Sequence, residues 1–160
     1  MGEVMTVDPK KYLFINTSAN RDGKTAELGT ALLEDLPSER IDLIDYRIGF
    51  FGQEFADDEY EVVFEKVIAS DVVVLGSPVY TDNMSAAARA FLERLECHPR
   101  AKELAGRAIA FIIQGYQVGP TLLEAAVNTV KNAAEPQGMT YLGAASDMVE
   151  LAELREKFDD

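Results

Sequence analysis

The most informative stretch of the sequence is Gly76-Ser77-Pro78-Val79-Tyr80-Thr81-Asp82-Asn83-Met84-Ser85, which joins an apolar run to a helical pattern. The run before it, residues 72–75, contains only Val and Leu, which is typical of a strand buried on both faces. Pro78 fixes φ and has no N–H donor, and the small polar residues around it favour a turn. The stretch therefore predicts a strand that ends in a polar turn, where open α/β sheets bind ligands.

Strand-length apolar runs alternate with helical patterns along the rest of the chain. Strands are expected at residues 12–15, 41–44, 72–75, 107–113 and 139–144. Helices are expected at about residues 24–36, 57–69, 84–95, 121–134 and 148–158. Strands that alternate with helices form a parallel sheet covered on both faces. We therefore predict a single α/β domain over residues 1–160, with a five-stranded parallel sheet.

The composition argues against several classes of partner. The net charge of −13 disfavours nucleic acid and anionic membranes as partners, because both require clustered Lys and Arg. The first residues lack the pattern of a leader sequence, and no apolar run is long enough to span a bilayer, so we expect a cytoplasmic protein with no membrane partner. Cys97 is the only cysteine, which excludes an internal disulfide, and no metal-ligand spacing is present.

A second polar segment, residues 16–25, follows the first expected strand and leads into a helix. Backbone N–H groups at a helix N-terminus favour an anion, so this turn is a candidate phosphate site. The candidate ligands are Ser18, Asn20, Lys24 and Thr25, with Arg21 as a further positive charge. The alternative is a helix start capped by Asp22 or Thr17, with no ligand.

The same segment nearly matches the P-loop of nucleoside triphosphatases, G-x-x-x-x-G-K-[ST]. Gly23, Lys24 and Thr25 fit that pattern, and Asp45 is available to hold a metal. However, Ser18 occupies the position of the first Gly, where a positive φ disfavours it. A P-loop would also leave the turn after residues 72–75 unexplained, so this alternative is less favoured.

The two polar segments together resemble the flavodoxin-like NAD(P)H-dependent FMN reductase family. Residues 77–85 are similar to its S-P-V-Y-x-x-x-M-S sequence, and Ser18, Gly23 and Thr25 match its S-x-R-x-x-G-N-[ST] loop. Asn20 and Lys24 depart from that loop, where Arg and Asn are usual. The resemblance covers residues 11–146 and implies a flavodoxin-like three-layer sandwich with strand order 2-1-3-4-5.

The resemblance also implies the cofactor and the activity. FMN would place its phosphate at residues 18–25, and hydride or electrons would pass from NAD(P)H through FMN to a small acceptor such as a quinone or free flavin. Because the flavin carries the chemistry, no catalytic side chain is expected. The implied contacts with the ring are Pro78, Val79, Tyr80, Thr81, Asn83 and Met84, together with Gly115 and Tyr116 after the fourth strand.

Similar family members form dimers with the flavin near the interface, so the resemblance implies a homodimer. The loop of residues 46–55 carries Phe50, Phe51 and Phe55 and is the expected contact surface, unless these side chains pack onto their own core. An electron-carrier flavodoxin without a nicotinamide site is the main alternative function, because an acidic surface also steers redox partners. A cofactor-free binding domain on the same fold is a third possibility.

Other charged or reactive residues are interpreted as structural. Asp57, Asp58 and Glu59 are expected to be solvated charges at a helix N-terminus, and Arg94 is expected on the outward face of its helix. Cys97 and His98 are adjacent in the sequence at a helix end and do not face each other there. A Cys–His nucleophile pair is therefore not expected.

Overall fold

The computed structural model describes residues 8–159 and contains a central sheet of parallel strands. The strands are β1 (Tyr12–Asn16), β2 (Ser38–Asp42), β3 (Val72–Tyr80), β5 (Ala108–Gln114) and β6 (Thr140–Ala145). Their spatial order is β2-β1-β3-β5-β6, which is the predicted order 2-1-3-4-5 when only the parallel strands are counted. A short strand, β4 (Asn83–Met84), folds back antiparallel onto the end of β3.

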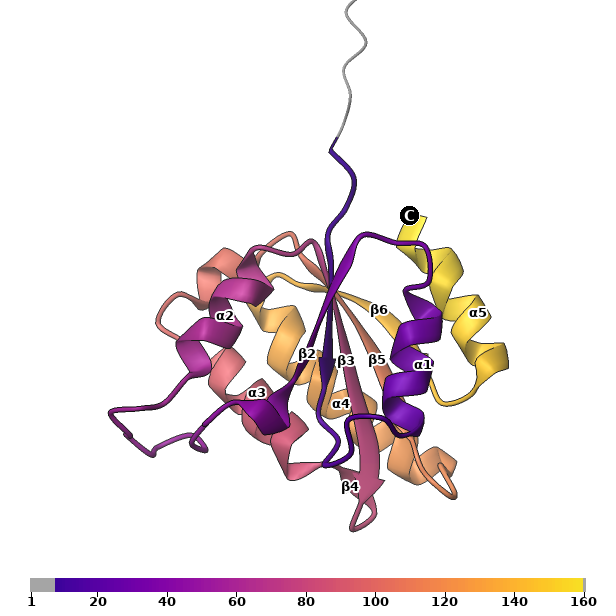
Figure 1. Cartoon of the computed structure of the whole chain (residues 1–160), viewed down its shortest axis with the longest axis horizontal. Helices are drawn as coiled ribbons and strands as arrows, with labels where there is room; N and C mark the ends of the chain where they lie inside the picture. Colours follow the sequence, from indigo (N-terminus) through magenta and orange to yellow (C-terminus); the bar gives the residue numbers. More distant parts are fainter. Residues whose placement is uncertain (1–7, 160) are drawn as a thin grey trace, which may run out of the picture.

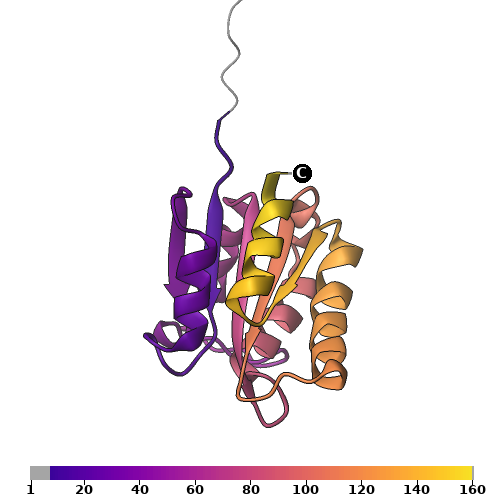
Figure 2. The same cartoon turned by 90° about the vertical axis from the view of Figure 1, so that its right-hand side faces the viewer.

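Helices cover both faces of the sheet, so the three-layer sandwich is confirmed (Figures 1 and 2). The helices α1 (Lys24–Leu32) and α5 (Met148–Glu156) pack on one face, and α2 (Tyr60–Ile68), α3 (Ala86–Glu96) and α4 (Pro120–Ala134) pack on the other. Short 3-10 turns are formed by Leu43–Asp45, Ala101–Leu104, Glu135–Gln137 and Lys157–Asp159. Within residues 8–159, no helix combines the length and the apolar composition that crossing a bilayer requires.

The predicted positions of two strands were wrong, for different reasons. β2 lies at Ser38–Asp42 rather than at 41–44, because it is an edge strand in which only Ile41 is buried. Its first residues are exposed and carry no apolar signal. β3 continues beyond residue 75 to Tyr80, because Ser77 and Pro78 still pair with Ile113 and Gln114 of β5.

Four helices are shorter than predicted. α1 ends at Leu32 instead of residue 36, and Asp35 follows with a positive φ of 65°. α2 begins at Tyr60 instead of residue 57. α3 begins at Ala86 instead of residue 84, because Met84 belongs to β4 and Ser85 is the N-cap. α5 ends at Glu156 instead of residue 158. Gly29 lets α1 lie close to β1, because a Cβ atom there would be 2.2 Å from the Phe14 ring. This close packing fixes α1 against the strand that precedes it.

Candidate functional site

Three loops meet at the carboxyl end of the sheet, at the lower end of the molecule in Figure 1. They follow the neighbouring strands β1, β3 and β5. The strand register places Asn16 beside Gly76, and Pro78 beside Gln114. The strand order reverses between β1 and β3, which is the position where open α/β sheets bind ligands.

The first loop, residues 17–23, is held by short-range hydrogen bonds in which backbone amides donate to side-chain oxygens. The Ser18 N–H donates to Asn16 Oδ1 at 3.2 Å, the Asn20 N–H donates to Ser18 Oγ at 3.0 Å, and the Asp22 N–H donates to Asn20 Oδ1 at 3.0 Å. Asn16 itself is buried, and its amide donates to Asp42 Oδ1 of β2 at 2.8 Å. Hydrogen bonds within the protein therefore hold the conformation of this loop.

The start of α1 differs from the starts of α3 and α5. Ser85 and Asp147 cap α3 and α5, since each side chain accepts an N–H from the first turn of its helix. The N-cap of α1 is Gly23, and no N-cap side chain accepts a hydrogen bond from that helix, as is also the case for α2 and α4. The first amides of α1 are thus open to an external acceptor, in the field of the helix dipole.

The second loop is a tight hairpin between β3 and β4. Tyr80 pairs with Asn83, so only Thr81 and Asp82 form the turn. Both have a positive φ, 50° and 56°, as a type I′ turn requires. Among residues other than glycine, Asn and Asp adopt this conformation most readily, whereas β-branched residues such as Thr81 rarely do, so the hairpin is strained at Thr81.

Three buried hydroxyl side chains join the base of the hairpin to the first loop. Ser77 Oγ accepts the Ser85 N–H at 2.8 Å and donates to the Pro78 carbonyl at 2.8 Å. Ser85 Oγ lies 2.9 Å from both the carbonyl oxygen and the hydroxyl of Thr17. The Thr17 hydroxyl in turn donates to the Gly76 carbonyl at 2.7 Å. The two loops are therefore fixed relative to one another.

Tyr80 makes the second connection between the hairpin and the first loop. Its hydroxyl accepts the Ala19 N–H at 3.2 Å and lies 3.4 Å from Ser18 Oγ. The side chain is 44% exposed, so the phenol reaches the first loop across the surface rather than through the core. The structure thus brings together Ser18, a predicted ligand of the FMN phosphate, and Tyr80, which the family resemblance places against the flavin ring.

The third loop, residues 115–119, lies beside the hairpin at Gly115. A Cβ atom at Gly115 would be 2.8 Å from Val79 Cβ, so this position requires glycine. Tyr116, by contrast, is fully exposed to solvent. Gly115 therefore shapes the contact between two loops, whereas Tyr116 has no contact of this kind.

The remaining predicted ligands differ in their accessibility. Thr81 and Asn83 are exposed at the hairpin tip, and Pro78 is buried. Met84 is also buried and belongs to the core beneath the hairpin. Thr25 is buried beside Gly76, but its hydroxyl forms no hydrogen bond with another described residue, and no buried polar side-chain atom in residues 8–159 lacks a partner. Its oxygen is thus accessible at the start of α1.

Acidic side chains accompany the positive charges around the first loop. Arg21 pairs with Asp45, whose hydrogen bond raises the pKa of the guanidinium, and Lys24 Nζ lies 3.2 Å from Glu27 Oε2. Asp45 was the candidate metal ligand in the P-loop alternative, and here it forms an ion pair instead. In the described part of the chain, no group of three or more acidic, His or Cys side chains is placed to hold a metal.

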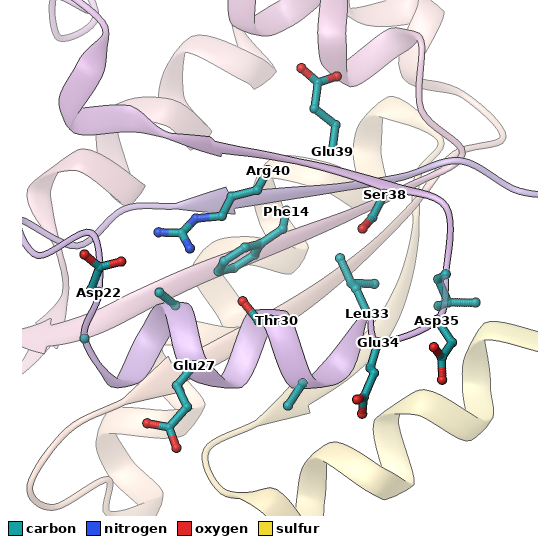
Figure 3. Close-up of a pocket in the computed structure, with 15 residues that line it drawn as sticks. Phe14, Asp22, Glu27, Thr30, Leu33, Glu34, Asp35, Ser38, Glu39 and Arg40 are labelled. Atoms are coloured by element: carbon teal, nitrogen blue, oxygen red, sulfur yellow. The ribbon is translucent and has the colours of Figure 1, made fainter.

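A groove of about 820 Å³ adjoins the first loop at Asp22 and Gly23 and is not lined by the other two loops. It runs between α1 and the edge strand β2, with Phe14 at its floor and Arg40 at its rim (Figure 3). The groove forms because β2 is the edge strand of the sheet and lies to one side of α1. The acidic side chains that line it are Asp22, Glu27, Glu34, Asp35 and Glu39. These five carboxylates, of which only Asp22 belongs to the first loop, disfavour an anion along the groove, so we place the candidate phosphate site at the loops.

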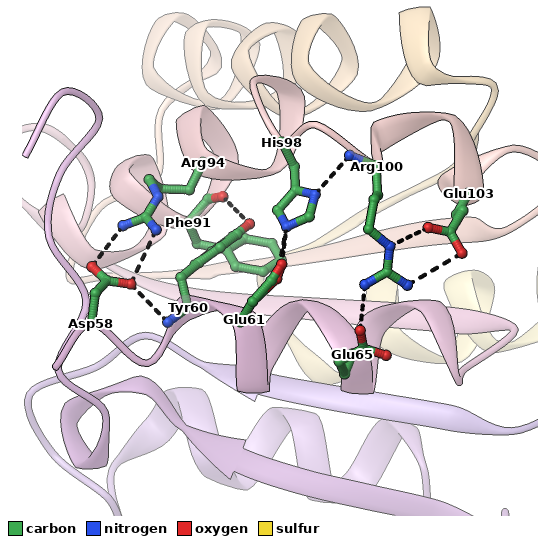
Figure 4. Close-up of polar contacts among 9 residues, drawn as sticks. All are labelled: Asp58, Tyr60, Glu61, Glu65, Phe91, Arg94, His98, Arg100 and Glu103. Atoms are coloured by element: carbon green, nitrogen blue, oxygen red, sulfur yellow. Dashed lines mark hydrogen bonds and ion pairs between the residues drawn. The ribbon is translucent and has the colours of Figure 1, made fainter. Parts of the chain in front are cut away.

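Asp58 and Arg94 form an ion pair that the sequence did not reveal (Figure 4). Two nitrogens of Arg94 donate to the two carboxylate oxygens at 2.9 and 3.0 Å, and the guanidinium lies over the Tyr60 ring. Asp58 also accepts the Gly49 and Tyr60 N–H groups. The predictions of a solvated Asp58 and an outward Arg94 were therefore wrong, because α3 packs against the start of α2.

Cys97 and His98 do not form a nucleophile pair. The His98 Nδ1 atom accepts the Arg100 N–H at 2.9 Å, and Nε2 contacts the Glu61 carboxylate (Figure 4). The imidazole ring also stacks on Phe64, with the ring centroids 3.5 Å apart. Desolvation by neighbouring atoms, followed by the charges of Glu96 and Glu93, raises the pKa of the exposed Cys97 thiol, which makes it less reactive. Both residues are structural, as the sequence predicts.

The fold and the position of the loops define a flavodoxin-like α/β protein with a ligand site at the strand ends. The sequence profile of NADPH-dependent FMN reductases matches residues 11–154, and the chain belongs to this family. FMN is therefore the cofactor, and NAD(P)H is the electron donor that the family implies. No curated protein sequence matches the chain significantly.

Solved structures with the same fold include several flavin-related proteins. The Trp repressor binding protein from Bacillus subtilis has a TM-score of 0.67 and 15% identity, covering 94% of this chain and 96% of that one. RosB with a bound 8-demethyl-8-formylriboflavin-5'-phosphate intermediate has a TM-score of 0.70 and 18% identity, over 94% and 77% of the two chains. An azoreductase from Bacillus anthracis str. Sterne has a TM-score of 0.59 and 15% identity, over 92% and 93%. These similarities establish the flavodoxin-like fold.

Proposed function

We propose that this protein is an FMN-dependent oxidoreductase that passes electrons from NAD(P)H to a small acceptor such as a quinone or free flavin. The observation that carries the proposal is the meeting of the three loops predicted to bind the ligand at one end of the sheet, where α1 and α4 both start without a side-chain cap. The flavin supplies the chemistry, so the proposed reaction requires no metal. A cytoplasmic location and a small-molecule acceptor remain predictions, in agreement with the acidic surface.

The first loop and the start of α1 have the chemistry that a phosphate requires. The amides at the start of α1 have no side-chain cap, and the Thr25 hydroxyl forms no hydrogen bond with another described residue. Ser18 adds a hydroxyl whose oxygen already accepts the Asn20 N–H, so its proton is available to a ligand. These groups are all donors, as binding of an anion needs. The residues present therefore fit FMN.

The hairpin and Gly115 supply the surface for the flavin ring. Residues 80–83 are exposed, and the hydroxyl network at Ser77 and Ser85 holds the hairpin in place. Bound FMN would supply the hydride and electron transfer. The chain would bind the phosphate, orient the ring on a rigid backbone and leave one side of it open to NAD(P)H and the acceptor in turn.

The proposal is tested by adding NAD(P)H anaerobically to the purified protein loaded with FMN. We expect the oxidised flavin absorbance to disappear, and to return when a quinone is added. Flavin that NAD(P)H reduces slowly, but that a separate reductase protein reduces fast, would favour the electron-carrier alternative. Protein that binds no flavin would contradict both functions.

We also propose that two copies associate through the phenylalanine loop, residues 46–55. Phe50 and Phe51 are 61% and 57% exposed, so they do not pack onto their own core. The loop is nevertheless rigid, because Arg94 and Asp58 bind the backbone of Gly49 from both sides. A fixed apolar surface of this kind is typical of an interface.

Light scattering measures this association directly. We expect a dimer for the natural chain and a monomer for the double substitution Phe50→Ser, Phe51→Ser. Because each chain carries a net charge of −13, added salt should strengthen the dimer by screening repulsion. A natural chain that stays monomeric at high salt would contradict the proposed interface.

A further inference from the structure

Two hydroxyl groups from different loops face each other at the edge of the candidate site. The Tyr80 oxygen accepts the Ala19 N–H at 3.2 Å, and the Ser18 oxygen accepts the Asn20 N–H at 3.0 Å. The two oxygens are 3.4 Å apart, well beyond the usual O–H···O separation of about 2.7–2.8 Å. Each hydroxyl thus accepts one backbone N–H and donates to no described residue at the usual distance, so each can donate to a ligand.

The surroundings of this pair favour an anion as the ligand. Within residues 8–159, neither hydroxyl donates to any group besides the other hydroxyl. Accepting a backbone N–H polarises each O–H group and makes it a better donor. Gly23, which starts α1 without a side-chain cap, lies against Asn20 in the same short loop. The hydroxyl groups of Tyr80 and Ser18 and the uncapped start of α1 therefore place several hydrogen-bond donors in one small region.

We propose that the Tyr80 and Ser18 hydroxyls together donate to the phosphate of FMN. This assignment rests on the proposed FMN site and refines it, because Tyr80 becomes a phosphate ligand rather than only a contact of the ring. Tyr80 also belongs to the hairpin that faces the ring, 61 residues from Ala19 along the chain. Binding of the phosphate to the Tyr80 hydroxyl would thus also fix the position of the hairpin.

The substitution Tyr80→Phe tests the assignment, because it removes only the hydroxyl and keeps the ring on the surface of the hairpin. The matched control is Tyr141→Phe, in β6, where the Tyr141 hydroxyl forms no hydrogen bond with another described residue. FMN and riboflavin are titrated separately into the natural chain and both variants, with flavin fluorescence as the readout. Thermal unfolding of each variant without flavin checks that the fold is kept.

We expect Tyr80→Phe to weaken FMN binding about tenfold or more and to leave riboflavin binding unchanged, since only FMN carries the phosphate. Tyr141→Phe should change neither affinity. Equal losses for both flavins would show that Tyr80 contacts the ring. Unchanged FMN binding would show that the Tyr80 hydroxyl only accepts the Ala19 N–H. Either result would overturn the assignment of Tyr80 to the phosphate but not the FMN site. A natural chain that binds neither flavin would overturn the FMN site itself.

Discussion

Replacing Asp58 with Asn is expected to destabilise the fold at neutral pH but not in strong acid. The carboxylate accepts two hydrogen bonds from Arg94 and one each from the Gly49 and Tyr60 amides. These contacts, with Arg94 as the largest cause, lower the pKa of Asp58 from 3.8 to about 2. The Asp58 side chain is only 13% exposed, so water screens the ion pair incompletely.

The pKa shift sets the size of the effect and its direction with pH. A shift of this size corresponds to about 2.4 kcal/mol of stability at neutral pH, and partial screening reduces it to about 1–2 kcal/mol. Because the pKa is lower in the folded state, the stabilisation is complete above about pH 4 and is lost as the pH falls through about 2. The asparagine introduced by Asp58→Asn would also turn an amide donor toward Arg94, which adds to the loss at neutral pH.

Urea unfolding at a series of pH values, followed by circular dichroism, measures this difference. The matched control is Asp57→Asn, since Asp57 is 68% exposed and pairs with Arg47, which is also exposed. We expect a clear loss for Asp58→Asn at pH 7, little change for Asp57→Asn, and a gap between Asp58→Asn and the natural chain that closes near pH 2. Equal effects of the two substitutions, or a gap that persists in acid, would refute the role of the ion pair.

Three further predictions concern the candidate site. Gly115→Ala should weaken FMN binding in a titration, because the new Cβ atom would lie 2.8 Å from Val79 and overpacking costs about 1–3 kcal/mol. Adding Val79→Gly, which removes both the Cβ atom and the methyl group in the way, should restore binding. A double variant that stays weak would show that Val79 is not the obstacle. Thr25→Val keeps the buried volume but removes the hydroxyl, so FMN should bind about tenfold more weakly while riboflavin is unaffected; equal losses for the two flavins would argue against a contact with the phosphate. Thr81→Asn combined with Asp82→Gly supplies the residues that the type I′ turn prefers and should raise the free energy of unfolding by about 1 kcal/mol. An unchanged urea midpoint would mean that the turn is not strained.

The order of the elements could be predicted because the sheet is buried on both faces. Residues 72–75 and 108–113 read as continuous apolar runs, and the structure places them at the centre of the sheet. β2 was misplaced because an edge strand with one buried residue, Ile41, has almost no hydrophobic signal. The burial of a strand thus decides how well the sequence locates it.

The sequence predicted those parts of the site that consist of residues close together along the chain. The polar residues after the first and third expected strands marked two loops, and the parallel topology brings those loops together. The contact of Tyr80 with Ala19 depends on a hairpin that Pro78 concealed, since proline suggests the end of a strand. The pairing of Asp58 with Arg94, 36 residues away, depends on how α3 packs, which no local pattern encodes.

The central claim is that FMN lies at the three loops and not in the groove beside α1. Amide chemical shifts of the isotope-labelled protein, recorded while FMN is added, test this claim most directly. We expect the largest changes at residues 18–25, at residues 80–83 and at Gly115. Changes centred on Thr30 and Ser38, which line the groove, would contradict the claim.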